Sequence, residues 1–250
     1  MPDDMYLGGN LIRQFKTQQS AVFAIGEYCF EIVRLESGKT WDFGGDGTRV
    51  VLVLSTDKGA SVIATNSGRG LVSGDAITIE ASRETLTAKS GAATLIVSGC
   101  DAAAGQKAEI SILNADEQYT VHKPWGSETW ISGEHPTFSF KRVSLFKGQR
   151  TSLQYHRLKR ETNVLFEGQI ALVYKENSQV NNDNVADSDL GRAVFTPLSA
   201  IDVTPGILHR IEALEDTVLY EVSTPHLDDV VRVQDDRGRG DGRVLSEHRQ

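Results

Sequence analysis

Four side chains with metal-binding chemistry lie within or after a stretch bounded by glycines, residues 148–168. Gln154 and His156 alternate along one short run, so an extended strand would place both on the same face. Glu161 follows a polar connection and begins the next expected strand. His209 comes just after a Pro-Gly turn signal. One amide oxygen, two imidazoles and one carboxylate brought together would hold a divalent metal ion and leave a position for substrate.

The spacing of these residues resembles that of the cupin motifs. The first motif is matched by Gly148, five residues, Gln154-x-His156, four residues, Glu161, six residues and Gly168. Gln154 stands where this motif has its first histidine, and Gly206-x-x-His209 is similar to the core of the second motif. The resemblance implies a small antiparallel barrel of the double-stranded β-helix, or jelly-roll, type.

Residues 122–239 resemble, more narrowly, the type II mannose-6-phosphate isomerase domain at the C-terminus of bifunctional isomerase and GDP-mannose pyrophosphorylase proteins. The matching segments are Lys123-Pro124-Trp125-Gly126-Ser127, Phe140-Lys141-Arg142-Val143, Leu153-Gln154-Tyr155-His156 and Pro205-Gly206-Ile207-Leu208-His209. The resemblance implies a metal-dependent interconversion of mannose 6-phosphate and fructose 6-phosphate. The chain departs from that family at Arg157, Leu158 and Thr162, where the family is rich in histidine.

The ligand set Gln154, His156, Glu161 and His209 suits one divalent ion. Zinc is favoured, because the zinc-dependent phosphomannose isomerases of the other, larger type use a similar set. Manganese, iron and nickel are also compatible with these donors. In an aldose–ketose isomerisation such an ion stabilises the charge that develops on neighbouring oxygens.

A sugar phosphate also needs cations beyond the metal. Arg142 and Arg210 are the catalytic candidates, the second because it directly follows His209. The substrate-binding candidates are Lys123, Trp125, Lys141 and Arg150. The tryptophan would stack on a sugar ring or fill the open end of the barrel.

Short apolar and β-branched runs, separated by turn residues, fill both halves of the chain. This pattern predicts an all-β protein of two tandem cupin barrels, a bicupin. We expect an N-terminal barrel over residues 1–105, a C-terminal barrel over residues 106–239 and a disordered tail over residues 240–250.

The N-terminal half contains none of the six histidines, which all lie at position 122 or later. Counting along the motifs places Gly44 and Thr85 where the first ligand and the last histidine would stand. The N-terminal barrel is therefore expected to lack a metal site and to serve a structural or dimerising role.

The amino-acid composition limits the kinds of partner that the protein is expected to bind. The 34 acidic and 26 basic residues give a net charge of −8, which argues against nucleic acid or an anionic membrane as a partner. The sequence shows neither an apolar run of about 20 residues nor a signal segment, so a cytoplasmic protein is expected. Cys29 and Cys100 lie in apolar runs and are predicted to be buried thiols. The expected partners are a small-molecule sugar phosphate and, in a homodimer, a second copy of the chain.

The sequence is also compatible with functions other than an isomerase. One is a non-catalytic barrel that binds a sugar or another metabolite, with the metal structural or absent. Another is a cupin enzyme that acts on a different small carbohydrate or acid. A third is an iron-dependent oxygenase, whose usual two or three imidazoles fit the Gln154 position poorly.

Overall fold

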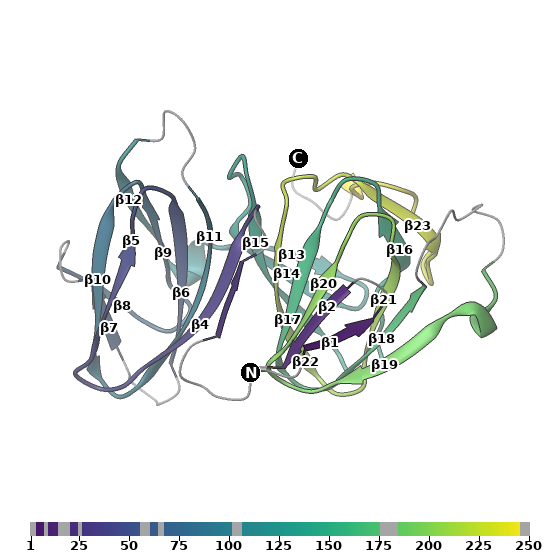
Figure 1. Cartoon of the computed structure of the whole chain (residues 1–250), viewed down its shortest axis with the longest axis horizontal. Coiled ribbons are helices and arrows are strands. Elements are labelled where there is room, and N and C mark those ends of the chain that lie inside the picture. The colour runs from purple at the N-terminus through teal and green to yellow at the C-terminus, as the bar shows by residue number, and fades with distance from the viewer. Residues whose placement is uncertain are drawn as a thin grey trace. The chain divides into compact units, whose positions relative to one another are not determined.

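The computed structural model describes residues 4–7, 10–14, 21–24, 27–55, 61–64, 68–101, 107–175 and 185–245. These residues divide into two compact units (Figure 1). Unit 1 comprises residues 1–16, 120–130 and 139–250, and unit 2 comprises residues 17–119 and 131–138. Both are built almost wholly of strands. The described residues include no helix long or apolar enough to cross a lipid bilayer.

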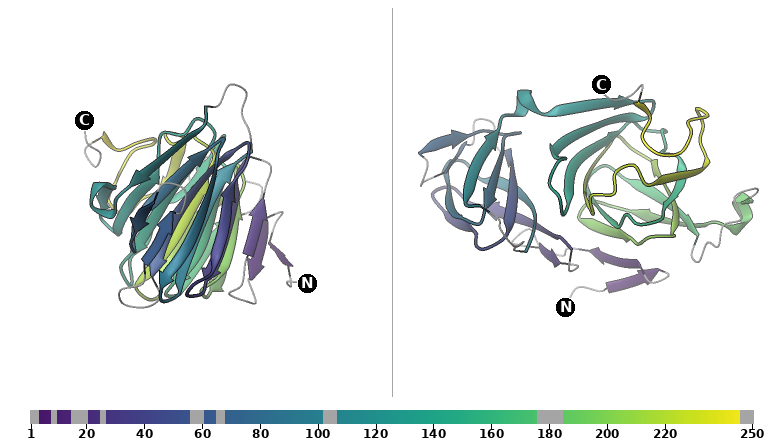
Figure 2. Two further views of the ribbon diagram at one scale, coloured as in Figure 1. Left: turned by 90° about the vertical axis from the view of Figure 1, so that its left-hand side faces the viewer. Right: turned by 90° about the horizontal axis from the view of Figure 1, so that it is seen from above.

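Unit 1 is a sandwich of two antiparallel sheets (Figure 2). The eight-stranded sheet has the order β1 (Asp4–Leu7), β2 (Asn10–Gln14), β20 (Ser199–Val203), β17 (Glu161–Glu167), β22 (Thr217–Ser223), β15 (Ser139–Leu145), β14 (Gly126–Ser132) and β13 (Tyr119–Lys123). The five-stranded sheet has the order β19 (Gly191–Phe195), β18 (Ile170–Lys175), β21 (Leu208–Ala213), β16 (Leu153–His156) and β23 (Val230–Gln234). One 3-10 turn, η2 (Asp187–Asp189), precedes β19.

The core of unit 1 lies between its two sheets. Leu165 and Leu219 of the larger sheet are buried in one apolar cluster with Leu172 and Ile211 of the smaller sheet. Residues two apart along each strand share a face, which is why β-branched and aliphatic residues at alternate positions fill this layer. At one end of the same layer polar side chains replace aliphatic ones, and the candidate site lies there.

Unit 2 repeats this design. Its six-stranded sheet has the order β12 (Glu109–Leu113), β9 (Ala76–Glu80), β6 (Thr48–Ser55), β11 (Ala93–Cys100), β4 (Cys29–Leu35) and β3 (Ala21–Ala24). Its four-stranded sheet has the order β5 (Thr40–Gly44), β10 (Arg83–Ser90), β7 (Ser61–Ala64) and β8 (Arg69–Leu71), and a 3-10 turn, η1, spans Ala115–Glu117. Cys100 is buried, Cys29 is half-buried, and both are free thiols.

The all-β prediction of two barrels is confirmed, but the chain is divided differently from the predicted domains. Strand β12 pairs with β9, and Ile110 and Ile112 pack on the core of unit 2, although they fall in the predicted C-terminal barrel. Conversely, β2 pairs with β20 and so joins the larger sheet of unit 1. Residues 102–106, which hold the predicted boundary, lie outside the described residues.

The predicted disordered tail also differs from the structure. Residues 240–245 are described, and Gly242 N donates a hydrogen bond to Val230 O at 2.8 Å. Arg232 Nη1 donates to the carbonyl oxygen of Gly242 at 2.9 Å. Backbone and arginine hydrogen bonds, rather than apolar anchors, hold this segment. Residues 246–250 lie outside the described part of the chain.

The two motif glycines of unit 1 differ in what surrounds them. Both have positive φ, 77° at Gly148 and 83° at Gly168. A Cβ at Gly148 would meet nothing within 4 Å, whereas at Gly168 it would lie 2.3 Å from the carbonyl oxygen of Asp216. Gly148→Ala is therefore expected to cost about 1 kcal/mol of unfolding free energy, from backbone strain alone. Gly168→Ala should cost at least about 2 kcal/mol more, because its backbone neighbour must move.

Urea unfolding of the two variants measures this difference. Gly148→Ala is the matched control, since it shares the positive φ and lacks the clash. Equal losses of stability in both variants would contradict the close approach at Gly168.

Candidate metal centre

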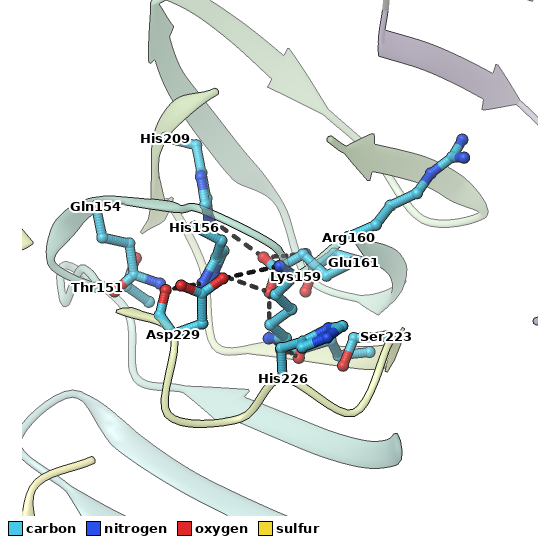
Figure 3. Close-up of polar contacts among 12 residues, drawn as sticks. Thr151, Gln154, His156, Lys159, Arg160, Glu161, His209, Ser223, His226 and Asp229 are labelled. Carbon is cyan, nitrogen blue, oxygen red and sulfur yellow. Dashed lines mark hydrogen bonds and ion pairs between the residues drawn. The ribbon is translucent and has the colours of Figure 1, made fainter. Parts of the chain in front are cut away.

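Three of the four predicted ligands converge at the polar end of unit 1 (Figure 3). His156 ends β16, Glu161 begins β17 and His209 lies on β21. Their ligand atoms lie within 4.8 Å of one another, and all three residues are buried. Glu161 Oε2 lies 3.4 Å from His156 Nε2, and Oε1 lies 3.2 Å from His209 Nε2. The carboxylate therefore lies between the two imidazoles.

Backbone carbonyl groups fix the tautomer of both rings. His156 Nδ1 lies 3.1 Å from the carbonyl oxygen of Asp229, and His209 Nδ1 lies 3.0 Å from that of Ile207. Because a carbonyl oxygen only accepts, each Nδ1 carries the hydrogen and each neutral ring leaves a lone pair on Nε2. Both lone pairs then face the Glu161 carboxylate, which is also an acceptor. His156 Nε2 is buried and has no hydrogen-bond partner among the described residues.

The electrostatics of the cluster favour neutral imidazole at His156. Burial, followed by the nearby Lys159 ammonium, lowers the pKa of His156, and these effects outweigh the attraction of Glu161. Burial alone would raise the pKa of Glu161, but the nearby Lys159 ammonium holds it well below its usual value. The site thus presents two imidazole nitrogens and one ionised carboxylate, which is a ligand set for a divalent cation.

Gln154, the fourth predicted ligand, lines the same cavity as the three others. It is the cross-strand partner of His209, so the two side chains share a face of the smaller sheet. Ser152 Oγ lies 2.6 Å from the Gln154 amide oxygen and donates a hydrogen bond to it. An amide oxygen has a second lone pair, so this bond orients the group and leaves it able to bind a cation.

A chain of buried ion pairs leads away from Glu161, and the sequence analysis did not predict it. Its members, in order of contact, are Glu161, Lys159, Glu221, Lys141, Glu128 and Lys123. Lys159 Nζ lies 2.5 Å from Glu161 Oε2 and 2.7 Å from Glu221 Oε1. Lys141 Nζ lies 3.1 Å from Glu221 Oε2 and 3.0 Å from Glu128 Oε1. We call these six residues the ion-pair chain.

Strand pairing explains how the ion-pair chain forms. Lys141 on β15 and Asn163 on β17 are both cross-strand partners of Glu221 on β22. Asn163 Nδ2 in turn donates to Glu161 Oε1 at 3.1 Å. Burial alone would raise the pKa of Glu128, but the neighbouring ammonium groups of Lys141 and Lys123 lower it to about 2. Each charge is thus buried beside an opposite charge.

The ligands and the ion-pair chain line one cavity of about 110 Å³. Trp125 and Trp130 contribute aromatic surface to it, and Lys141 Nζ lies 5.2 Å from the ring centre of Trp130. Since a single water needs about 10–15 Å³ by this measure, the cavity has room for roughly ten water-sized groups. Its wall combines hydrogen-bonding groups with aromatic faces, so a polar ligand fits it better than an apolar one.

The predicted substrate-binding residues divide into two groups. Lys123, Lys141 and Trp125 line the metal cavity, as expected. Trp125 is also part of the apolar core, so it fills the end of the barrel while facing the cavity. Arg150 lines a neighbouring cavity instead and forms a bidentate ion pair with Asp236, at 2.7 and 2.8 Å.

Neither predicted catalytic arginine reaches the metal cavity. Arg142 is exposed, because its buried neighbours Lys141 and Val143 point to the inner face of β15. Arg210 points to the opposite face from His209, since successive residues of a strand alternate. Its Nε donates to the carbonyl oxygen of Thr151 at 3.0 Å and its Nη2 to that of Gln234 at 3.2 Å. We conclude that Arg210 joins β21 to its neighbouring segments.

Asp229 is a positioning residue that the sequence analysis missed. Its backbone carbonyl orients His156, as described above, and its carboxylate accepts hydrogen bonds from the backbone of Leu158 at 2.5 Å and Lys159 at 2.8 Å. One residue therefore holds both a ligand ring and the turn that leads to Glu161. Its sequence signal, an acidic pair in a loop, is too common to single it out.

Unit 2 has no corresponding site among its described residues. The only group of three metal-binding side chains found in the described chain is that of unit 1. At the corresponding strands of unit 2, Phe43 and Leu86 are buried in the apolar core, with Trp41 packed against it. Thr85 instead donates a hydrogen bond to Asp42 at 2.7 Å.

Comparison with known proteins supports the cupin fold. No protein-family model matches the sequence, and no curated protein matches it. The protein Ylba from E. coli matches with a TM-score of 0.65 and 10% identity, over 89% of this chain and 93% of that one. Vicilin from tomato matches with a TM-score of 0.60 and 11% identity, over 90% and 83% of the two chains.

A third similar structure is the formate complex of oxalate decarboxylase from Lactobacillus farciminis. It has a TM-score of 0.58 and 10% identity, and the match covers 90% of this chain and 83% of that one. At such identities the likeness shows the fold alone, so the protein is a bicupin by fold. None of these three structures is a mannose-6-phosphate isomerase, and that narrower resemblance stays a prediction.

Proposed function

We propose that unit 1 binds one divalent metal ion and uses it to convert a small polar metabolite. His156, Glu161 and His209 would hold the ion, with Gln154 as a further oxygen ligand. The observation that carries this proposal is the pair of fixed tautomers, which aim two Nε2 lone pairs at one carboxylate. Three acceptors facing one another in a buried site repel unless a cation lies between them.

The donor set supports zinc, manganese, iron or nickel, as expected from the sequence. One structural neighbour supports a metal in this fold. It is the oxalate decarboxylase of Bacillus subtilis, described as having Mn(II) centres, which matches with a TM-score of 0.58 and 11% identity over 89% of this chain and 74% of that one. Elemental analysis of the purified protein would identify the ion.

The reaction we propose is the aldose–ketose isomerisation of a sugar phosphate, of the mannose 6-phosphate type. A metal ion would act as a Lewis acid on the substrate's carbonyl and hydroxyl oxygens. Lys159 Nζ and Glu221 Oε1, 2.7 Å apart in the same cavity, are the groups that could give and take the proton moved between neighbouring carbons. Lys123, Lys141 and Asn163 would bind the sugar hydroxyl groups.

A second candidate is a metal-free barrel that binds a polar metabolite without converting it. The contact between Lys159 Nζ and Glu161 Oε2 favours this alternative, because the ammonium already neutralises the carboxylate. In that case Lys159 takes the place that a cation would occupy. The two candidates differ in whether the purified protein carries metal.

Elemental analysis of the protein purified from metal-supplemented medium tests the proposal. We expect about one divalent ion per chain. NMR of mannose 6-phosphate incubated with the metal-loaded protein should show conversion to fructose 6-phosphate. Bound metal without turnover of any hexose phosphate would reject the isomerase alone, and protein without metal would favour the binding barrel.

A further inference from the structure

The C-terminal segment of unit 1, residues 232–244, forms part of the wall of the metal cavity. Arg232 N donates to Asp241 Oδ1 at 2.7 Å, and Arg232 Nη1 donates to the carbonyl oxygens of Gly240 and Gly242. With the bond from Gly242 N to Val230 O, these contacts fix the segment against β23. We call residues 232–244 the C-terminal strap.

The strap adds three arginine side chains to the wall of the cavity. Arg232, Arg239 and Arg243 line it together with the ion-pair chain, giving six basic side chains against three acidic ones. Leaving the histidines out, the lining residues alone carry a surplus of three positive charges, in a chain whose net charge is −8. Asp235 and Asp228, which pair with Arg239 and Arg243 outside the lining, reduce this surplus to one. The three lysines and three glutamates of the ion-pair chain balance one another. The surplus therefore comes from the arginines of the strap.

Two of these arginines are held by carboxylates outside the cavity. Asp235 Oδ2 accepts from Arg239 Nε at 3.0 Å and from Arg239 Nη2 at 2.7 Å. Asp228 Oδ1 lies 2.8 Å from Arg243 Nε. Neither aspartate lines the cavity, whereas both arginines do, so each ion pair orients a guanidinium at the cavity wall. The Arg239 side chain is only 11% exposed, which places it in the wall rather than in solvent.

Arg239 also lines the neighbouring cavity of about 140 Å³, together with Arg150 and Arg237. Asp235 and Asp236 face the same space. Arg239 therefore lies where the two cavities meet. The anionic group of a ligand bound at the metal would lie toward this arginine-rich end.

We propose that the C-terminal strap is the anion-binding site of the metal cavity and that Arg239 and Arg243 bind the phosphate or carboxylate group of its ligand. The role that the sequence analysis gave to Arg142 and Arg210 thus passes to the strap. This inference deepens the proposed function, because it names the ligand as an anion. It does not need the metal to be present, since the arginines are fixed by aspartates and backbone groups.

Isothermal titration of the full-length protein at low ionic strength tests the site, since salt screens such charges. The probes are inorganic phosphate and malonate, which separate a phosphate site from a carboxylate site. Arg239→Gln and Arg243→Gln should each weaken binding of the preferred probe about tenfold, as expected for loss of a charge-assisted hydrogen bond. Arg192→Gln is the control, because Arg192 is a half-exposed arginine of the same unit that does not line the cavity.

Arg239→Lys provides a second variant that keeps the charge and should lose less affinity than Arg239→Gln. Elemental analysis of each variant separates this inference from the proposed function. The strap would be supported as the anion-binding site if anion binding is weaker in the strap variants and if metal-free wild-type protein still binds the anion. This result would stand even if no metal or turnover is found. Unchanged binding in both glutamine variants, or failure of wild-type protein to bind either probe, would overturn it.

Discussion

Replacing His209 by alanine is expected to lower the metal affinity of the protein by roughly 100-fold or more. The variant removes one of two imidazole donors and leaves His156 and Glu161 as the remaining pair of the cluster. Because Lys159 already contacts Glu161 at 2.5 Å, the weakened site should favour the ammonium over a metal ion. Elemental analysis should fall from about one ion per chain to near zero, and stabilisation by added metal should disappear.

His226→Ala is the matched control for this experiment. His226 lies in the same unit, but its Nδ1 contacts Thr224 Oγ1 at 3.2 Å and the residue does not line the cavity. We expect its metal content and its response to added metal to equal those of the wild type. A His209→Ala protein that kept its full metal content would show that the ion binds elsewhere, and the proposed centre would then be wrong.

The three clustered ligands could be predicted because local rules place them. Alternation along a strand brings Gln154 and His156 near one end of β16, and the short connection returns the chain at Glu161. His209 required a long-range pairing, which the turn before it indicated. The observed partnership of Gln154 with His209 fulfils that expectation. Sequence spacing was therefore sufficient to predict the position of a ligand when that position is set by one strand and its nearest turn.

The ion-pair chain could not be predicted in this way, because it depends on strand register. Both faces of β15 carry buried residues, Phe140 on one and Val143 on the other. The sequence alone therefore does not show whether Lys141 or Arg142 points inward. Only the pairing of β15 with β22 places Lys141 opposite Glu221. Lys141 and Arg142 were both predicted to serve the site, but neighbouring residues of a strand point to opposite faces, and only Lys141 lines the cavity.

The C-terminal strap escaped prediction for a different physical reason. Its residues are mainly arginine, aspartate and glycine, a composition typical of disorder because it offers little apolar surface to bury. Hydrogen bonds from Arg232 and the ion pair of Arg239 with Asp235 order it instead. These contacts form only when the folded chain brings the groups together, so composition alone wrongly predicts that the segment is disordered.

Replacing Glu221 by glutamine is expected to cost about 3–5 kcal/mol of unfolding free energy, the range for a broken buried ion pair. Glu221 Oε1 contacts Lys159 at 2.7 Å and Oε2 contacts Lys141 at 3.1 Å, and all three side chains are under 10% exposed. An amide can offer an oxygen to only one of these ammonium groups, and its NH₂ group would face the other. Two buried lysines would then share less negative charge, so unit 1 should lose stability.

Urea unfolding followed by tryptophan fluorescence measures this loss, since Trp125 and Trp130 lie in the same cavity as the ion-pair chain. Glu212→Gln is the control, because Glu212 contacts Arg192 at 3.1 Å and that arginine is 50% exposed. A surface pair of this kind should cost about 1 kcal/mol or less. If Glu221→Gln cost no more than Glu212→Gln, water would have to solvate the lysines. The cavity wall would then be hydrated rather than built from buried charges.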